Sequence, residues 1–147
     1  MPISITIYTD GAARGNPGRS ASGFIALDDK GKTLAKEWVY NGIGTNNEAE
    51  YSAIILALDW CFKASIDHKT TKISLFSDSE LIVQQLNMKY KTKSKALVAK
   101  RDEALKLAKN FPNIRFSNVP RETEGIAKVD KYLNQMLDLT EKEEKSS

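Results

Sequence analysis

Three acidic residues stand beside the ends of predicted strands and helices, where their carboxylates could meet. Asp10 follows an Ile-rich segment with strand periodicity, Asp78 follows another such segment, and Glu50 falls in the first turn of a long helix. Each has an ordinary explanation, because Asp begins turns and caps helices, and a Glu three residues after Asn47 can reach back to the cap. Adjacent strand ends, however, lie about 4.8 Å apart, so their side chains can also share one cation.

Asp130 is harder to explain by local structure. In the last predicted helix, the apolar stripe of Ile126, Leu133 and Leu137 includes this aspartate. A charged group that faces the core is costly unless it is paired, either in a salt bridge or with a cation. If all four acids converged without a cation, they would repel one another and raise each other's pKa. Hard divalent ions such as Mg²⁺, or Mn²⁺ in its place, remove this repulsion, and two ions about 3.5–4 Å apart would suit in-line displacement at phosphorus.

The elements that would position these acids follow from hydrophobic periodicity. Strand patterns cover Ile3 to Asp10 and the segments 23–27, 33–40, 72–77 and 114–119, with a loop over 12–20. Helical patterns and capping residues cover about 48–63, 79–87, 95–109 and 124–139. Two short connections predict that the first three strands form an antiparallel meander, and a helix then crosses over to the fourth. The pattern therefore predicts an α/β fold with a mixed sheet, in which Asp10 and Asp78 meet if the first and fourth strands are neighbours.

Composition favours one domain, residues 1–139, followed by a disordered tail over 140–147. The net charge of +3 permits a polyanionic partner without demonstrating one. No apolar run approaches the ~20 residues of a membrane span, and nothing at the N-terminus resembles a signal peptide. The single cysteine, Cys61, cannot form an internal disulfide. We therefore expect a cytoplasmic protein that acts without a membrane.

Four motifs resemble one known family. From Ile3 to about Leu139 the chain is similar to type 1 ribonuclease H, and the matching motifs are YTDGAARGNPG (8–18), TNNEAEYSA (45–53), SDSEL (77–81) and AKVDKYLN (127–134). The resemblance implies a ribonuclease H-like fold with a five-stranded mixed sheet in the order 3-2-1-4-5, strand 2 antiparallel, flanked by helices. It also implies a monomeric endoribonuclease that cuts the RNA strand of an RNA–DNA hybrid with two Mg²⁺ ions, leaving 5′-phosphate and 3′-hydroxyl ends.

By the same resemblance, particular residues take particular roles. The catalytic metal ligands are Asp10, Glu50, Asp78 and Asp130, with Glu50 matching the family's acid rather than Glu48. The residues that approach the RNA minor-groove edge are Asn16, Asn46 and Asn47, and Thr45 corresponds to a DNA-phosphate contact. A carboxamide beside a 2′-hydroxyl can tell RNA from DNA, because that hydroxyl both donates and accepts. The alternatives are a loop Asn that stabilises its own turn at Asn16, and helix capping at Asn46 and Asn47.

The sequence departs from the best-known bacterial pattern at two places. A His expected before the last helix is replaced by the VPRE segment (119–122) typical of archaeal-like relatives, so Arg121 or Glu122 would take its auxiliary role. The only histidine, His68, is interpreted as a surface residue. The lysine-rich run 88–95 stands in place of a Trp-containing basic protrusion, and Lys89 and Lys91 would contact DNA-strand phosphates. A solvated loop is the alternative for this run.

Two rival functions come from other classes. One is a nucleic-acid-binding module with an inactive nuclease-like fold, which the presence of all four acids opposes. The other is a different nuclease of the same fold, such as a junction resolvase or transposase core. The NNxxE motif and the GNPG loop favour an enzyme that reads hybrids.

Overall fold

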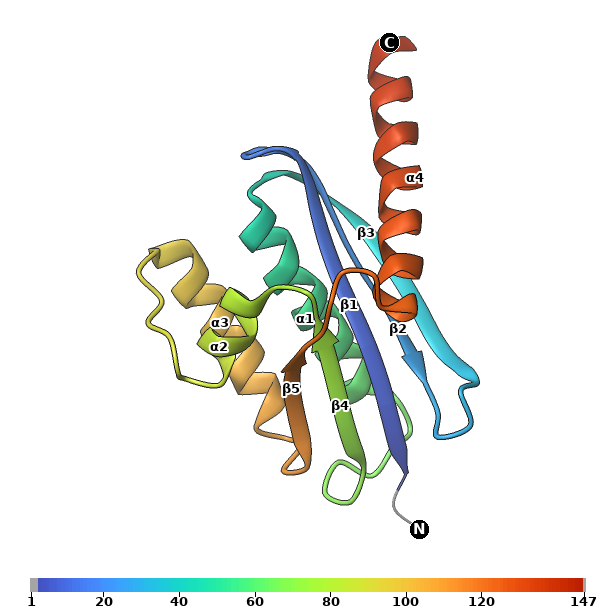
Figure 1. Ribbon diagram of the computed structural model, residues 1–147, viewed down its shortest axis with the longest axis vertical. Coiled ribbons are helices and arrows are strands. Elements are labelled where there is room, and N and C mark those ends of the chain that lie inside the picture. The colour runs from blue at the N-terminus through green and yellow to red at the C-terminus, as the bar shows by residue number, and fades with distance from the viewer. Residues whose placement is uncertain (1–2, 147) are drawn as a thin grey trace.

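The computed structural model describes residues 3–146 as one five-stranded sheet with helices on both faces (Figure 1). The strands are β1 (Ser4–Gly15), β2 (Gly18–Leu27), β3 (Thr33–Gly44), β4 (Lys72–Ser77) and β5 (Ile114–Asn118). The helices are α1 (Asn46–Lys63), α2 (Glu80–Leu86), α3 (Lys95–Ala108) and α4 (Glu124–Ser146). The order β3-β2-β1-β4-β5, with antiparallel β2 pairing and parallel β4 and β5 pairing, confirms the expected fold.

The hairpin of β1 and β2 is longer than the sequence pattern predicts. The predicted loop over 12–20 is wrong, because β1 and β2 stay paired from Asp10–Gly23 out to Gly15–Gly18. The parallel pairing of β1 with β4 ends earlier, at Tyr8–Phe76. Asp10 therefore lies inside β1, two residues beyond the end of the β1–β4 ladder, and not at a strand end. There β1 runs on without its parallel neighbour, so one edge of it faces the cleft described below.

Two apolar cores hold the helices to opposite faces of the sheet. The larger core packs α1 and α3 on one face, with Ile5, Ile7 and Leu75 from the strands against Ile54 and Leu58, all of them buried. The smaller core packs α4 on the other face through Val129, Leu133 and Leu137 against Ala21 and Ile25. This three-layer arrangement buries a helix stripe on each face of the sheet. The fold thereby fixes α1 and α4 on either side of β1.

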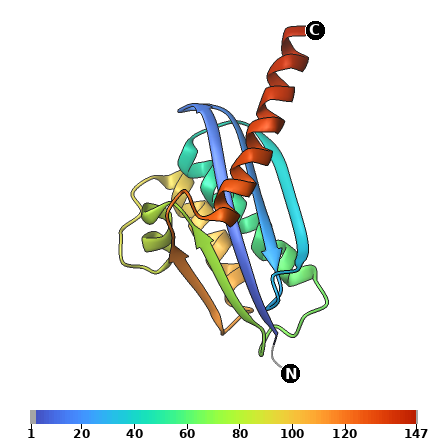
Figure 2. The ribbon, with the colours of Figure 1, turned by 45° about the vertical axis from the view of Figure 1, so that its right-hand side comes forward.

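Helix α4 extends further than expected (Figure 2). The sequence pattern predicts an end near Leu139 and a disordered tail, but the helix continues to Ser146. Two arginines of the β1–β2 hairpin hold this extension, because Arg14 pairs with Asp138 and Glu141 and Arg19 pairs with Glu144. Ion pairs therefore join the hairpin to the last turns of the helix, beyond the end of the β1–β4 ladder. The composition of this segment did not indicate these contacts. Within residues 3–146, no helix has the length and apolar character needed to cross a membrane.

Candidate active site and metal centre

Three carboxylates from separate parts of the chain meet beside the end of the β1–β4 ladder. Oxygen atoms of Asp10, Glu50 and Asp78 all lie within 4.8 Å of one another. Asp10 comes from β1, Glu50 from the second turn of α1, and Asp78 directly follows β4. For each of these three acids the sequence left a structural and a metal-binding interpretation open. Such a spacing lets all three bind one cation.

Gly11 allows Glu50 to reach this cluster. A Cβ atom at Gly11 would lie 2.3 Å from the carbonyl carbon of Ala49 and 2.4 Å from the backbone nitrogen of Glu50. The backbones of β1 and α1 therefore touch at this point, and only a residue without a side chain fits. Ser22 strengthens the contact from β2, because its hydroxyl donates to the carbonyl oxygen of Ala49 at 2.6 Å. The close approach brings Glu50 beside Asp10.

Glu50 does not cap its helix. Thr45 is the N-cap, and its hydroxyl accepts from the backbone nitrogen of Glu48 at 3.1 Å. The Glu48 carboxylate in turn accepts from the backbone nitrogen of Thr45 at 3.0 Å, which completes a capping box. The capping interpretation of Glu50 is therefore wrong, because Glu48 holds that position. The Oε2 atom of Glu50 is instead buried, and it has no hydrogen-bond partner within residues 3–146.

Asp130 reaches the same cleft from the opposite face of the sheet. The first turn of α4 lies directly on Tyr8, because a Cβ atom at Gly125 would come within 2.2 Å of that ring. Asp130 follows Val129 on the side of the helix that faces β1, and it is half-buried. Among residues 3–146 no basic side chain forms an ion pair with it, which excludes the salt-bridge alternative over the described chain. Its hydrogen bond comes from the Asn134 amide, at 3.2 Å from Oδ2.

Crowding and burial of these acids change their protonation. Burial, followed by the charges of Asp78 and Asp130, raises the pKa of Asp10 from an ordinary 3.8 to about 8. Burial and the neighbouring Asp10 raise the pKa of Glu50 well above its usual value. Burial also raises the pKa of Asp78, although the guanidinium of Arg121 opposes this effect. Without a cation, the cluster retains protons that isolated carboxylates would lose.

The donor set fits a hard divalent metal ion. All the candidate ligands are carboxylate oxygens, which Mg²⁺ and Mn²⁺ prefer over nitrogen or sulfur ligands. Burial of a polar atom without a partner is costly, and a bound cation would offset this cost at the buried Oε2 atom of Glu50. Asp10, Glu50 and Asp78 could together hold one such ion, and Asp130 lines the same cleft.

A cleft of about 690 Å³ contains the four acids and two of the residues assigned to substrate. Asn46, Asn47 and Arg121 line it, and the Nε atom of Arg121 lies 4.0 Å from Asp78. Glu122, the other auxiliary candidate, is exposed and does not line this cleft. A larger groove of about 850 Å³ lies apart from these acids, between α1 and α3. The chemistry therefore belongs to the smaller cleft.

The asparagines connect the hairpin tip to the start of α1. The Asn16 side-chain oxygen accepts from the backbone nitrogen of Asn46 at 3.1 Å, so Asn16 binds the helix and not its own turn. The Asn46 side-chain oxygen accepts from the backbone nitrogen of Ala13 at 3.0 Å. Since Thr45 provides the cap, neither Asn46 nor Asn47 is the N-cap. Both asparagines lie within α1 and line the cleft beside the acids.

The lysines and the histidine lie elsewhere. Lys89 and Lys91 are exposed in the segment between α2 and α3, outside the acidic cleft. Next to them, the Tyr90 hydroxyl lies 3.3 Å from the carboxylate of Glu80. His68 is half-buried, and its ring packs against those of Phe62 and Phe111 with centroid distances of 5.3 and 4.6 Å, so it keeps part of the exposure predicted for it. Its packing also excludes it from the acid cluster.

Two residues near the site carried no role in the sequence analysis. Arg14 belongs to a matched motif, and Asn134 lies one helical turn beyond Asp130, but neither position carries a chemical signal of its own. In the structure, both lie in one polar network with Asp130. Their proximity depends on the packing of α4 across β1.

Comparison with known proteins gives a consistent result. Residues 8–144 match the family model described as reverse transcriptase-like. A ribonuclease HI of Halobacterium salinarum is 37% identical over 131 residues, which is 89% of this chain and 63% of that protein. A bifunctional protein of Mycobacterium tuberculosis is 32% identical over 137 residues, which is 92% of this chain but 36% of that protein. The chain thus spans less than two thirds of the length of these curated relatives.

Two solved structures are similar to this chain over most of its length. The RNase H1 structure from the archaeon Halobacterium salinarum has a TM-score of 0.84 and 35% identity, and the match covers 92% of this chain and 98% of that one. LC11-RNase H1, solved in complex with an RNA/DNA hybrid, has a TM-score of 0.81 and 38% identity, covering 89% of this chain and 94% of that one.

Proposed function

Because this chain belongs to the reverse transcriptase-like family, and within it to type 1 ribonuclease H, we propose that it is a metal-dependent endoribonuclease acting on RNA–DNA hybrids. It hydrolyses the RNA strand and leaves 5′-phosphate and 3′-hydroxyl ends. The observation that carries this proposal is the convergence of Asp10, Glu50 and Asp78 within 4.8 Å, with one buried oxygen of Glu50 lacking a partner among the described residues. A module that only binds nucleic acid would have no use for clustered carboxylates, because they repel one another and also repel phosphate groups.

The four acids would hold two Mg²⁺ ions, with Mn²⁺ as an alternative. Asp10 would be central to this set of ligands, because it lies beside Glu50 and Asp78 and its carboxyl also feels the charge of Asp130. When bound, the ions would activate a water molecule at neutral pH and stabilise charge on the leaving 3′-oxygen. The chain itself contributes orientation, because strands and helices hold each acid before substrate arrives.

Residues around the cleft would read the hybrid. Asn46 accepts from Ala13 through its carbonyl oxygen, which turns its NH₂ group toward donation to the RNA minor-groove edge. Asn16 and Asn47 would complete this contact. Thr45 accepts from Glu48 as a cap, so its hydroxyl hydrogen can still donate to a DNA phosphate. These roles favour a duplex whose two strands differ in their 2′-hydroxyl groups.

Charged residues outside the acid cluster would assist. Lys89 and Lys91 are exposed and would bind DNA-strand phosphates. Arg121, which lines the cleft near Asp78, is better placed than Glu122 for the auxiliary role of the missing histidine. We further propose that the protein acts as a monomer in a reducing, cytoplasmic setting.

A cleavage assay with matched substrates tests the proposal. Hybrid, duplex DNA and duplex RNA of one sequence are labelled on each strand and incubated with Mg²⁺, Mn²⁺ or EDTA. We expect cleavage of the RNA strand of the hybrid alone, in either metal and not in EDTA, with 5′-phosphate product ends. Binding of the hybrid without cleavage would support the inactive module. Preferential cutting of duplex or branched DNA would support another nuclease of this fold.

A further inference from the structure

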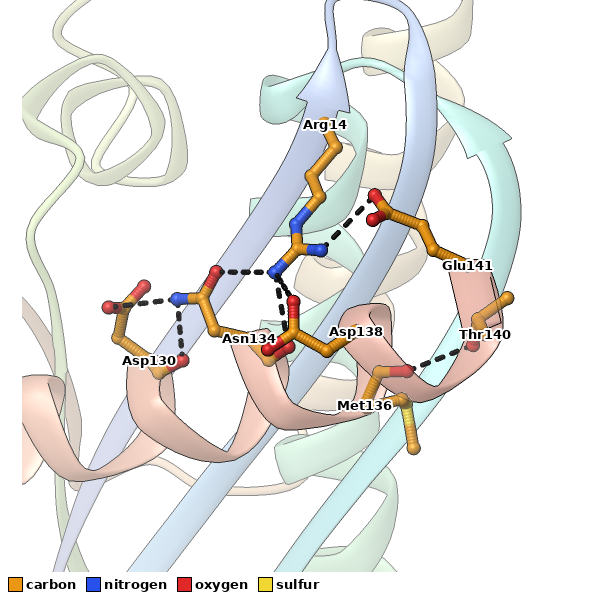
Figure 3. A network of polar contacts seen from close by, with 7 residues as sticks. All are labelled: Arg14, Asp130, Asn134, Met136, Asp138, Thr140 and Glu141. Atoms are coloured by element: carbon orange, nitrogen blue, oxygen red, sulfur yellow. Dashed lines mark hydrogen bonds and ion pairs between the residues drawn. The ribbon is translucent and has the colours of Figure 1, made fainter. Parts of the chain in front are cut away.

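The polar contacts of Asp130 continue through α4 to the β1–β2 hairpin (Figure 3). Asn134 donates through its Nδ2 atom to the Asp130 carboxylate at 3.2 Å and to the Asp130 backbone carbonyl at 3.0 Å. On the other side of the amide, the Nη2 atom of Arg14 donates to Asn134 Oδ1 at 3.3 Å and to the Asn134 backbone carbonyl at 3.1 Å. One amide group therefore connects an arginine to a metal-binding acid.

Arginine determines which way this amide faces. A guanidinium only donates hydrogen bonds, so the amide must present its carbonyl oxygen to Arg14. Its NH₂ group is then directed at Asp130. Without Arg14 the amide oxygen loses this donor, and the amide is held only by the contacts of its NH₂ group with the carboxylate and the backbone carbonyl of Asp130. The Arg14 side chain thus reinforces the orientation in which Asp130 receives its hydrogen bond.

Two acids on the next turns of α4 hold Arg14 in place. Its Nη2 atom lies 2.7 Å from Asp138 and its Nη1 atom lies 3.1 Å from Glu141, while the side chain is only 29% exposed. Arg14 also belongs to the same strand as Asp10, four residues further along. The strand that carries one metal-binding acid therefore also carries the residue that orients another.

We propose that Arg14, acting through Asn134, is a positioning residue that orients Asp130 for metal binding. This inference rests on the proposed function for its activity readouts. Residues that orient metal ligands from outside the coordination sphere typically change metal affinity or activity by about 10–100-fold when they are replaced. The Arg14 guanidinium faces α4 and not the cleft, so its removal acts on the metal and leaves substrate binding unchanged (Figure 3).

Arg19 provides a matched control. It lies on the same hairpin, carries the same charge and pairs with Glu144 of α4, and within residues 3–146 it forms no hydrogen bond or ion pair with Asn134 or Asp130. Arg14→Gln and Arg19→Gln are compared for hybrid cleavage and, independently of hybrid, for Mn²⁺ affinity by titration calorimetry. Near half-saturating Mg²⁺, we expect Arg14→Gln to lower kcat and Mn²⁺ affinity by about tenfold with KM unchanged. Arg19→Gln should change neither by more than about twofold, and Arg14→Lys should restore part of the loss.

A double-mutant cycle separates positioning from helix docking. Asn134→Leu removes the amide but keeps the ion pairs of Arg14 with Asp138 and Glu141, so α4 stays docked in this variant. It therefore still tests the role of the amide if the Arg14→Gln protein does not fold. Because Arg14 acts through this amide, adding Arg14→Gln to Asn134→Leu should change Mn²⁺ affinity by less than about twofold. Full additivity, equal losses in Arg14→Gln and Arg19→Gln, or a rise in KM alone would each overturn the proposal. If the wild-type protein cleaves no hybrid, the proposed function fails, while the Mn²⁺ affinities still decide the role of Arg14.

Discussion

The acidic cleft and the lysine-bearing segment between α2 and α3 carry opposite charges and are built in different ways. The acids come from β1, α1, α4 and the residue after β4, and contacts between backbones or with aromatic rings hold these elements together. Lys89 and Lys91 are exposed and lie outside regular secondary structure. A metal site needs ligands fixed within fractions of an ångström, whereas a phosphate backbone can be bound by charges in many positions. Substitutions should therefore have large effects in the cleft and small ones on the lysine segment.

Asp10→Asn should give the largest effect. Asp10 interacts with all three other acids, so an amide at this position removes the central ligand of the proposed metal site. We expect hybrid cleavage to be abolished while the circular dichroism spectrum stays native. Lys131→Ala, at an exposed position on α4, serves as the control and should retain wild-type activity. Native-rate cleavage by purified Asp10→Asn would refute the mechanism.

Gly11→Ala should test how the cleft is built. The new methyl group would meet the backbone of α1 at 2.3 Å, and backbone atoms cannot move away without displacing the helix. We expect a loss of about 3 kcal/mol in the free energy of unfolding, measured in urea, together with reduced Mg²⁺ affinity. Gly31→Ala offers a comparison, because no atom lies within 4 Å of its added Cβ, although its φ of +81° adds local strain. A Gly11→Ala protein with unchanged metal affinity would show that the close β1–α1 contact is not what positions Glu50.

Without metal, the free energy of unfolding should depend on pH through the clustered acids of the cleft. The folded pKa of Asp10 is about 8 against an ordinary 3.8, so between these values the folded state binds more protons than the unfolded state. Stability in EDTA should therefore be highest near pH 4 and decline toward pH 8. Asp10→Asn should flatten this decline and raise Tm at pH 8, and Mg²⁺ should stabilise the wild type more at pH 8 than at pH 5. Thermal unfolding in both buffers is the measurement, and a wild-type Tm that increases from pH 5 to pH 8 in EDTA would contradict it.

Replacing the lysines should have the smallest effect. Lys89→Ala with Lys91→Ala removes two exposed charges and leaves the acids untouched. We expect KM for hybrid to rise severalfold with kcat unchanged, and the slope of log affinity against log salt to fall by about one per lysine that contacts a phosphate. Lys106→Ala on α3, beside the groove away from the cleft, controls for the loss of a lysine elsewhere on the surface, and each single lysine variant is compared with it. Equal changes in the control and the double variant would support the alternative of a solvated loop.

Much of the fold could be predicted because its signals are local. Apolar residues alternating at Ile3, Ile5 and Ile7 predicted the first strand, and the segment 72–77 predicted β4 with its observed bounds. The extent of β1 was missed because Ala12 and Ala13 carry no apolar alternation, and their pairing depends on β2. The end of α4 was missed for a similar reason, since acidic residues read as a tail become helix once Arg14 and Arg19 pair with them.

Residue types and local periodicity were enough to identify the side chains that could bind metal and the order in which the elements follow one another. The packing of the elements was needed to show that Glu48 caps α1 while Glu50 lies beside Asp10 with its Oε2 atom lacking a partner among the described residues, and that Asn134 connects Asp130 to an arginine 120 residues from the amide. Hydrogen-bond partners and pKa values depend on burial and on charges that are close in space. Those distances are set by the packing of α1 and α4 on either face of β1, which no window of sequence contains.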